Sequence, residues 1–261
     1  MSKWIYFIFI CCFFACGKFV HSPYASKVSS KKLNSKGLKK IAAIEASHSD
    51  NFKVAVISDT HDYYSDLDKQ VKYINDRKNE IAFVLHTGDS TNLGLQVEFD
   101  MFLEFIDKLK VPFVMVIGNH DMLTNGVDIY KKYFSSKLNF SFSFKQTKFI
   151  LFNNNNWEST GEIPNLNFVE KELQASSATH NILLAHVQPD DDHRYSQREI
   201  DDMKALVDAH GVKLFINGHN HNYGAGTFGS AKRITVGSPV KGKIVILSIT
   251  NAGITSEHLD F

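Results

Sequence analysis

The sequence predicts an α/β fold, and three patterns support this class. From residue 51 onward, short apolar runs alternate with segments of helical periodicity, as in domains with a largely parallel sheet. After Asn139 the period becomes two, because Phe140, Phe142 and Phe144 alternate with polar residues as in half-buried antiparallel strands. Five of the apolar runs end in residue types that bind metals, and open α/β sheets bind ligands beyond the carboxyl ends of their strands.

Composition limits the functional classes. The 261 residues are 43% hydrophobic, enough to bury one sizeable core. Residues 1–50 hold eight lysines and two acids, which leaves 21 basic and 26 acidic side chains in residues 51–261. This balance argues against binding of duplex nucleic acid and is compatible with uptake of divalent cations. All three cysteines precede residue 17, so the folded body has neither a disulfide nor a thiolate metal site.

Residues 1–15 are interpreted as a secretory signal peptide. Lys3 precedes an apolar segment over residues 4–15, which is shorter than the roughly 20 residues that a spanning helix needs. The motif Phe14-Ala15-Cys16-Gly17 resembles the lipobox of bacterial lipoproteins, with Cys16 as the lipidated residue. The alternative is an uncleaved N-terminal anchor. In both cases we expect an exported protein, anchored to a membrane outside the cytoplasm.

Residues 16–50 are predicted to form a lipidated, flexible tether. The segment is rich in Ser and Lys and has no sustained apolar periodicity. Its lysines can lie against anionic lipid head groups or serve as a solvated spacer. The folded domain is therefore expected over residues 51–261.

Helices are expected where apolar residues recur on one face. This pattern covers residues 66–77 and 97–109, and helices are also expected over residues 167–173 and 199–209. Residues 234–236, 243–249 and 254–259 are predicted to be closing antiparallel strands. Two polar loops, residues 153–164 and 190–198, follow strand predictions and are long enough to be functional or mobile.

The strand ends carry the candidate metal ligands. Residues 54–58 precede Asp59 and His61, residues 81–85 precede Asp89, residues 112–117 precede Asn119 and His120, residues 182–185 precede His186, and residues 214–216 precede His219 and His221. Two carboxylates, one amide and four imidazoles are too rich in nitrogen for Mg²⁺ or Ca²⁺ and contain no sulfur for a structural zinc site. The set suits Mn, Fe, Zn or Ni. Seven ligands exceed the need of one ion, so we predict two divalent ions that share a carboxylate, about 3.5 to 4 Å apart.

The ordered motifs resemble those of a known family. Asp59-Thr60-His61, Gly88-Asp89, Gly118-Asn119-His120-Asp121, His186 and Gly218-His219-Asn220-His221 resemble the five motifs of the calcineurin-like metallophosphoesterases, over residues 52–261. Residues 88–94 and the helix after them resemble the class III cyclic-nucleotide phosphodiesterase branch. The resemblance implies a four-layer α-β-β-α sandwich with two mixed sheets. It also implies one metal bound by Asp59, His61, Asp89 and His221, and a second bound by Asp89, Asn119, His186 and His219.

The implied reaction is hydrolysis of a phosphodiester, nucleotide-like or other, by a hydroxide that bridges the two ions. By the resemblance, His120 faces the phosphoryl group of a small-molecule substrate, and Asn119 lies beside it. Asn92 stands where many members have an Asp that orients this His, so its amide is expected to orient His120. Trp157 is a candidate for stacking on a base, and His193 for contacting substrate. Loop packing for Trp157 and a solvated loop for His193 are the alternatives.

Two other functions stay open. A phosphomonoesterase or a nucleotide pyrophosphatase can use the same site. Outside enzymes, the alternative is a non-catalytic, surface-binding lipoprotein. No ligand of the motifs is missing from the sequence, which favours an enzyme.

Overall fold

Five strands form the first sheet, in the order β11-β10-β1-β2-β3, in a computed structural model that describes residues 28–161, 163–241 and 244–260. The parallel strands are β1 (Phe52–Ile57), β2 (Ile81–His86) and β3 (Phe113–Met115), and β10 (Ile244–Thr250) and β11 (Gly253–Leu259) add an antiparallel hairpin. Three helices cover the outer face of this sheet, namely α3 (Tyr64–Asp76), α4 (Gln96–Ile106) and α5 (Gly126–Tyr133). Helix α5 was not expected from the sequence.

Six strands form the second sheet, in the order β4-β5-β6-β7-β9-β8. The parallel strands are β5 (Thr147–Leu151), β6 (His180–Leu184), β7 (Leu214–Asn217) and β9 (Ala231–Thr235), and β4 (Phe140–Phe144) and β8 (Gly224–Phe228) are antiparallel edge strands. The predicted antiparallel closure is wrong for the pairing of β9 with β7. Strand β8 lies at the edge, and β9 returns between β8 and β7, so β9 runs parallel to β7.

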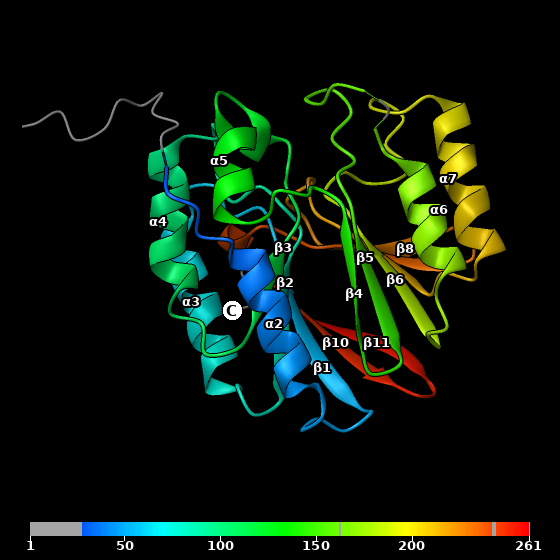
Figure 1. Cartoon of the computed structure of the whole chain (residues 1–261), viewed down its shortest axis with the longest axis horizontal. Helices are drawn as coiled ribbons and strands as arrows, with labels where there is room; N and C mark the ends of the chain where they lie inside the picture. Colours follow the sequence, from blue (N-terminus) through cyan, green and yellow to red (C-terminus); the bar gives the residue numbers. More distant parts are fainter. Residues whose placement is uncertain (1–27, 162, 242–243, 261) are drawn as a thin grey trace, which may run out of the picture.

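The two sheets pack face to face between helical layers, which confirms the predicted four-layer sandwich (Figure 1). Helices α6 (Leu166–Gln174) and α7 (Gln197–Ala209) form the outer layer on the second sheet. Strand β1 is apolar over its last four residues, 54–57, because these are buried on both faces. Val54 and Val56 enter the core between the sheets, whereas Ala55 and Ile57 pack under the helices, so both faces of the strand are buried.

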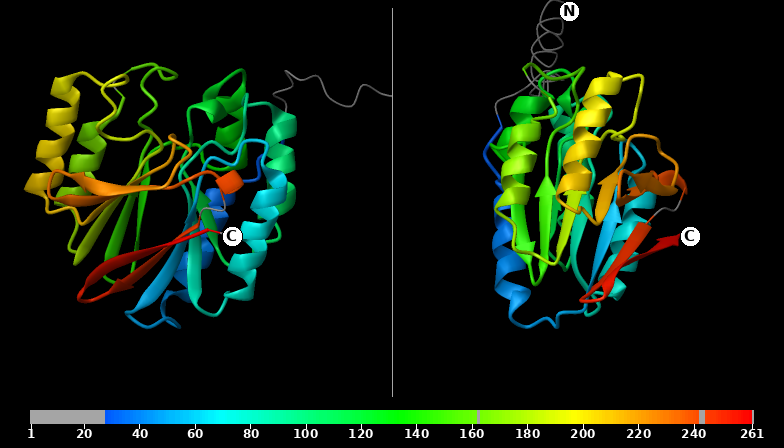
Figure 2. Two further views of the ribbon diagram at one scale, coloured as in Figure 1. Left: turned by 180° about the vertical axis from the view of Figure 1, so that it is seen from behind. Right: turned by 90° about the vertical axis from the view of Figure 1, so that its right-hand side faces the viewer.

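Helix α2 (Leu33–Glu45) lies within residues 16–50, which were predicted to form a flexible tether, and it corrects that prediction over its own length. It lies along the side of the sandwich where β3 and β4 are the edge strands. The β8–β9 and β10–β11 hairpins lie on the opposite side (Figure 2). The folded domain therefore includes α2 and begins before residue 51.

Polar and backbone contacts attach α2 to β3. Asn34 Nδ2 donates to the carbonyl of Met115 (2.8 Å), and Asn34 Oδ1 accepts from the N–H of Met115 (3.0 Å), as a neighbouring strand would. A Cβ on Gly37 would lie 2.0 Å from the carbonyl oxygen of Phe113, so only glycine allows this approach. Ile41 completes the buried face. Only Ile41 of these three buried residues is strongly apolar, and Leu38 and Ile44 beside it are partly buried, so the apolar face of the helix is short.

The predicted signal peptide, Cys16 and the first part of the predicted tether lie outside the described residues. Within the segments that are described, no helix combines the length and the apolar character needed to cross a membrane.

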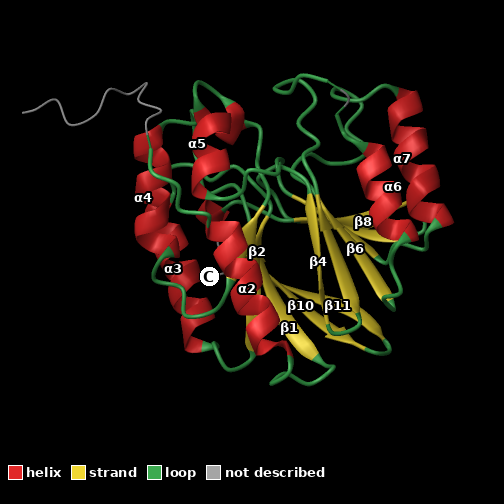
Figure 3. Ribbon diagram, viewed as in Figure 1, coloured by secondary structure: helices red, strands yellow, loops and turns green. Residues whose placement is uncertain are grey.

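The parallel strands of both sheets end at the same end of the sandwich, where the long loops gather (Figure 3). Two short 3₁₀ helices, η1 (His120–Met122) and η2 (Pro239–Lys241), follow β3 and β9. The motif residues after β1, β2, β3, β6 and β7 therefore meet at this end.

Candidate metal centre

The structure brings all seven predicted ligands together, although each sheet supplies only part of them. The carboxylate and imidazole members form two sets, Asp59, His61 and His221 in the first, and Asp89, His186 and His219 in the second. Within each set the candidate donor atoms lie within 4.8 Å of one another. Each set is therefore small enough to surround a single ion.

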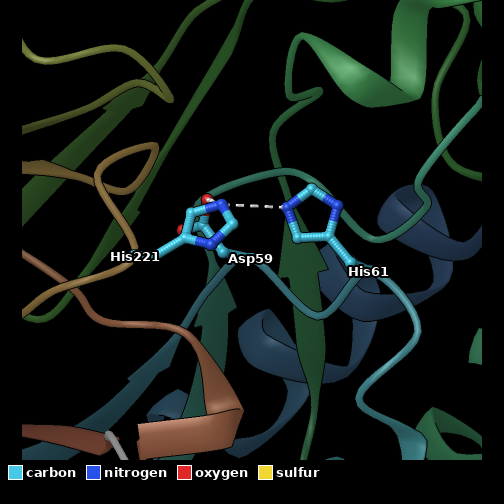
Figure 4. Close-up of side chains that lie close together, drawn as sticks. All are labelled: Asp59, His61 and His221. Carbon is cyan, nitrogen blue, oxygen red and sulfur yellow. Dashed lines mark hydrogen bonds and ion pairs between the residues drawn. The ribbon is translucent and has the colours of Figure 1, made fainter.

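The first set has the spacing of a shared ligand sphere (Figure 4). His61 Nε2 lies 3.1 Å from His221 Nε2, and His221 Nε2 lies 3.6 Å from Asp59 Oδ1. With metal–nitrogen bonds of about 2.0–2.1 Å, two donors on one tetrahedral ion lie about 3.3 Å apart. The observed separations agree with this value.

Asp89 lies between the two sets. Its Oδ2 atom is 3.1 Å from His186 Nε2 and 3.6 Å from His61 Nε2. The other oxygen, Oδ1, accepts from the backbone N–H of His120 (2.8 Å). Oδ2 is buried, and these two imidazole nitrogens lie close to it. An acceptor in this position suits a cation, and it can be shared by two.

Asn119 belongs with the second set. Its Oδ1 atom lies 3.0 Å from His186 Nε2 and 3.0 Å from His219 Nδ1. Two ring nitrogens therefore face one amide oxygen. With Asp89, these residues supply two oxygens and two nitrogens, a donor set that fits Mn, Fe, Zn or Ni.

The backbone of the candidate ligand residues is strained. Positive φ values occur at five of them, namely Asp59 (49°), His61 (46°), Asp89 (58°), His219 (72°) and His221 (57°). Such conformations cost on the order of 1–3 kcal/mol each, and they persist where the surrounding structure imposes them. Most of the residues that turn into the site at strand ends thus use a backbone conformation that their side chains disfavour.

Two glycines allow the carboxylates to lie against neighbouring backbone. A Cβ on Gly118 would lie 2.2 Å from Asp89 Oδ1, and one on Gly218 would lie 2.5 Å from Asp59 Oδ2. Both glycines immediately precede ligand residues. Glycine is therefore required at both positions because the loops approach each other closely.

Burial and mutual charge set the protonation of the centre. Burial raises the pKa of Asp59 to about 7, with His186 opposing and Asp89 adding to the shift. Burial would also lower the pKa of His186, but the Asp89 and Asp59 carboxylates outweigh it and raise that pKa to about 9. Burial lowers the pKa of His61 to about 4 and that of His219 to about 3. These two rings are therefore neutral at pH 7, and each keeps a lone pair for a metal.

His120 lies beside the first set, with its ring edge-on to His61 at a centroid distance of 4.8 Å. Asn92 contacts it as predicted, but through a different atom. His120 Nδ1 lies 2.7 Å from the main-chain carbonyl of Asn92, so the expected contact from the amide side chain is wrong. Because a carbonyl only accepts, Nδ1 carries a proton, and Nε2 is the nitrogen left for a substrate.

Trp157 and His193 lie on the neighbouring loops. Trp157 is 64% exposed, and the guanidinium of Arg194 lies 4.5 Å from its ring centroid. His193 is exposed, and its backbone N–H donates to Asp191 Oδ1 (3.0 Å). Contact of either residue with a substrate stays a prediction.

Sequence reasoning missed the role of Asp121. Its carboxylate accepts from Ser90 Oγ (2.8 Å), the N–H of Thr91 (3.0 Å) and the N–H of Gly118 (3.0 Å). It therefore ties the loop after β2 to the loop after β3. Burial, with the nearby charge of Asp89, raises its pKa to about 6. The sequence indicated this role only through the position of Asp121 in the motif Gly118-Asn119-His120-Asp121.

His86 fits none of the motifs, and the structure gives it a supporting role. Its Nδ1 accepts from the N–H of Gly88 (3.1 Å), so Nε2 carries the proton and donates to Thr60 Oγ1 (3.1 Å). Burial lowers its pKa to about 3, which agrees with a neutral ring. His86 thus joins the loop after β1 to the loop after β2. A histidine at the end of a buried strand was the signal in the sequence.

The sequence is similar to known phosphoesterases. A family profile described as calcineurin-like phosphoesterase matches residues 52–223. A curated relative, the probable glycerophosphodiester phosphodiesterase GpdQ of Arcobacter nitrofigilis, is 33% identical over 84 residues, which cover 28% of this chain and 31% of the relative. The match thus spans about a third of the length of that relative.

Solved structures share the fold. Purple acid phosphatase PPD1 from yellow lupin (Lupinus luteus) seeds aligns with a TM-score of 0.68 at 16% identity, over 82% of this chain and 52% of that one. A dimetal phosphatase from Danio rerio aligns with a TM-score of 0.64 at 14% identity, over 80% of this chain and 96% of that one. At these identities the similarity is one of fold.

Proposed function

This chain belongs to the calcineurin-like phosphoesterase family, and we propose that it hydrolyses phosphodiesters at a binuclear metal centre. The observation that carries the proposal is the position of Asp89, whose buried Oδ2 lies between imidazoles of both ligand sets. A single carboxylate oxygen within 3.6 Å of both sets is what a bridging ligand requires.

Two divalent ions, Mn, Fe, Zn or Ni, fit the donor set. The first would be held by Asp59, His61, Asp89 and His221, and the second by Asp89, Asn119, His186 and His219. When bound, the ions would lower the pKa of a water molecule between them and offset the negative charge that develops on the phosphoryl group.

His120 is proposed to contact the phosphoryl group. The carbonyl of Asn92 fixes its ring through Nδ1, which turns Nε2 into the functional nitrogen. With a proton on Nε2, the ring donates to a phosphoryl oxygen or to the leaving oxygen. Because Nδ1 already carries a proton, this second proton makes the ring an imidazolium, and donation from Nε2 to the phosphoryl group is the role that we assign to His120.

The choice of a diester rests on the curated relative, which is described as a probable glycerophosphodiester phosphodiesterase. A small phosphodiester is therefore the proposed substrate class, and the same site could take a monoester.

We test the proposal by the metal content of the purified chain and by its rates on bis-p-nitrophenyl phosphate and p-nitrophenyl phosphate. Near two equivalents of metal and faster cleavage of the diester are expected. Faster cleavage of the monoester would assign a phosphomonoesterase instead. Absence of turnover with metal bound would assign a binding protein. Inversion at a chiral phosphorus is expected, because no covalent enzyme intermediate is proposed, and retention would contradict that step.

The export and lipid anchor also stay a proposal, based on the sequence of residues 1–17. Cys16→Ala is expected to abolish labelling by radioactive palmitate in a bacterial host and to release the protein from the membrane fraction. Cys12→Ala is the matched control, and it should keep both. Equal labelling of the two variants would contradict lipidation at Cys16.

A further inference from the structure

A loop of residues 153–159 is fixed to the loops that carry the candidate ligands. Asn154 is fully buried, and its Oδ1 accepts from the N–H groups of His186 (3.1 Å) and Val187 (2.9 Å). Its Nδ2 donates back to the carbonyl of Val187 (2.7 Å). Asn155 Nδ2 donates to the carbonyl of Ile117 (3.0 Å), close before Asn119. The loop is therefore held against both the β3 and the β6 strand ends.

This loop carries an exposed aromatic ring, and the residues around the ring are held by hydrogen bonds and an ion pair. Trp157 is 64% exposed, whereas the side chain of Arg194 that lies over it is only 7% exposed. Arg194 Nη1 forms an ion pair with Glu158 Oε2 (2.7 Å). The carbonyl of Arg194 accepts from Asn156 Nδ2. Both the loop and the guanidinium are thus anchored, so the indole is held in place.

Trp157 stays 64% exposed although Arg194 lies over its ring. The guanidinium lies over one ring face at 4.5 Å from the centroid, and this contact stabilises the ring orientation. The loop that carries the ring is attached to the second ligand set, because Asn154 Oδ1 accepts from the backbone N–H of His186 (3.1 Å). Trp157 follows this attachment point by three residues in the chain.

We propose that Trp157, fixed by Arg194 and Glu158, is the stacking site for an aromatic group of the substrate, such as a nucleobase or an aryl alcohol. The inference rests on the proposed phosphodiesterase function and narrows its substrate class. A base stacked on an aromatic side chain contributes about 1–3 kcal/mol, and an aliphatic alcohol such as glycerol has no comparable face. The site thus favours diesters with a flat leaving or retained group.

The test compares two diesters in the metal-loaded protein, bis-p-nitrophenyl phosphate and glycerophosphocholine. Trp157→Ala is expected to lower the ratio of kcat/KM for the aromatic diester over the aliphatic one by about tenfold, within the range that stacking supplies. Trp157→Phe should restore most of the ratio. Val240→Ala is the matched control, because Val240 is also an exposed apolar residue and lies away from this loop, on η2. An unchanged ratio in Trp157→Ala would overturn the proposal.

Arg194→Lys tests the support of the ring. The variant keeps the charge but loses the planar group over the indole, so the ratio should fall by less than in Trp157→Ala. In the double variant with Trp157→Ala, Arg194→Lys should cause no further fall in the ratio. An equal further fall would mean that Arg194 acts without Trp157, and would contradict its role as a support.

A binding measurement separates this inference from the proposed function. Calorimetry of the metal-loaded protein compares adenosine monophosphate with glycerol 3-phosphate. Tighter binding of the nucleotide, lost in Trp157→Ala, supports the stacking site even if no diester is turned over. Equal binding of the two ligands by the unaltered protein overturns the stacking site even if diesters are hydrolysed.

Discussion

The metal centre and the edge covered by α2 both bury polar groups, but they do so by opposite rules. At the edge, Asn34 pairs with both the N–H and the carbonyl of Met115. In the centre, Asp89 Oδ2 faces ring nitrogens of both sets, His186 Nε2 at 3.1 Å and His61 Nε2 at 3.6 Å. Polar groups that pair one to one stabilise a fold, whereas several donor atoms that converge on one carboxylate suit a bound ligand.

The backbone conformations of the two regions also differ. The ligand residues take up positive φ values at five positions, whereas α2 is regular and approaches β3 through Gly37. Backbone strain is therefore concentrated in the centre, whereas the contacts of α2 at the edge stabilise the fold. Changes in α2 should alter folding with little effect on catalysis, and changes in the centre should do the reverse.

Removal of α2 is expected to have the largest effect. A chain of residues 51–261 leaves the edge strands β3 and β4 uncovered and exposes the apolar surface that Ile41 packs against. Uncovered strand edges pair with other chains, so this variant should aggregate. A chain of residues 28–261 is the control and should be soluble and monomeric. Size-exclusion chromatography and thermal melting measure the difference, and a cooperative, monomeric 51–261 chain would refute the role of α2.

Asp89→Asn should separate activity from stability. The variant keeps an acceptor for the N–H of His120 but loses the charge shared by the two ligand sets. We expect kcat/KM on the diester to fall by at least about 10²-fold, the scale of one lost electrostatic contact in a transition state. The midpoint of urea unfolding should change little. Asp68→Asn, on an exposed carboxylate that pairs with Lys108, is the control. Retained activity in Asp89→Asn would exclude a bridging role.

Asn34→Ala should show the opposite pattern. The N–H of Met115 loses its acceptor, while the carbonyl still accepts from Tyr130 Oη (2.7 Å). One unsatisfied buried donor costs about 1–3 kcal/mol, so the free energy of unfolding should fall by that amount. Diester hydrolysis at 25 °C should be unchanged. Urea titration measures the loss, with Ser35→Ala at an exposed neighbouring position as control. A loss of activity without a loss of stability would contradict the comparison.

Removal of metal should have the smallest and most local effect. Chelation is expected to lower Tm by about 2 to 4 °C, the shift for about 1 kcal/mol in a domain of this size. Amide hydrogen exchange should quicken at His61 and His219, because their strained loops lose the ions, and should stay unchanged at Met115. Uniform quickening would mean that the centre and the edge are one cooperative unit.

The convergence of the candidate ligands could be predicted from the sequence because each of them follows shortly after an apolar strand. The positions of Asp59, Asp89 and His186 depend only on the strand that precedes each of them. Because the parallel strands of both sheets end at the same end of the sandwich, these three residues lie close together. The same locality allowed the buried strands to be predicted, since strands buried on both faces are continuously apolar. The atom by which Asn92 contacts His120 could not be predicted, since it depends on the turn that the backbone makes after β2.

Helix α2 depended on distant contacts. The burial of Asn34 and Gly37 is explained by Met115 and Phe113, about 80 residues later in the chain. A polar residue and a glycine become core residues only where an edge strand offers unpaired backbone groups and where no Cβ can fit. The pattern of residue types by itself therefore determined the chemistry at the strand ends, because that chemistry is local. The packing of the sheets determined where the domain begins, because the backbone groups that α2 satisfies exist only after the sheets have formed.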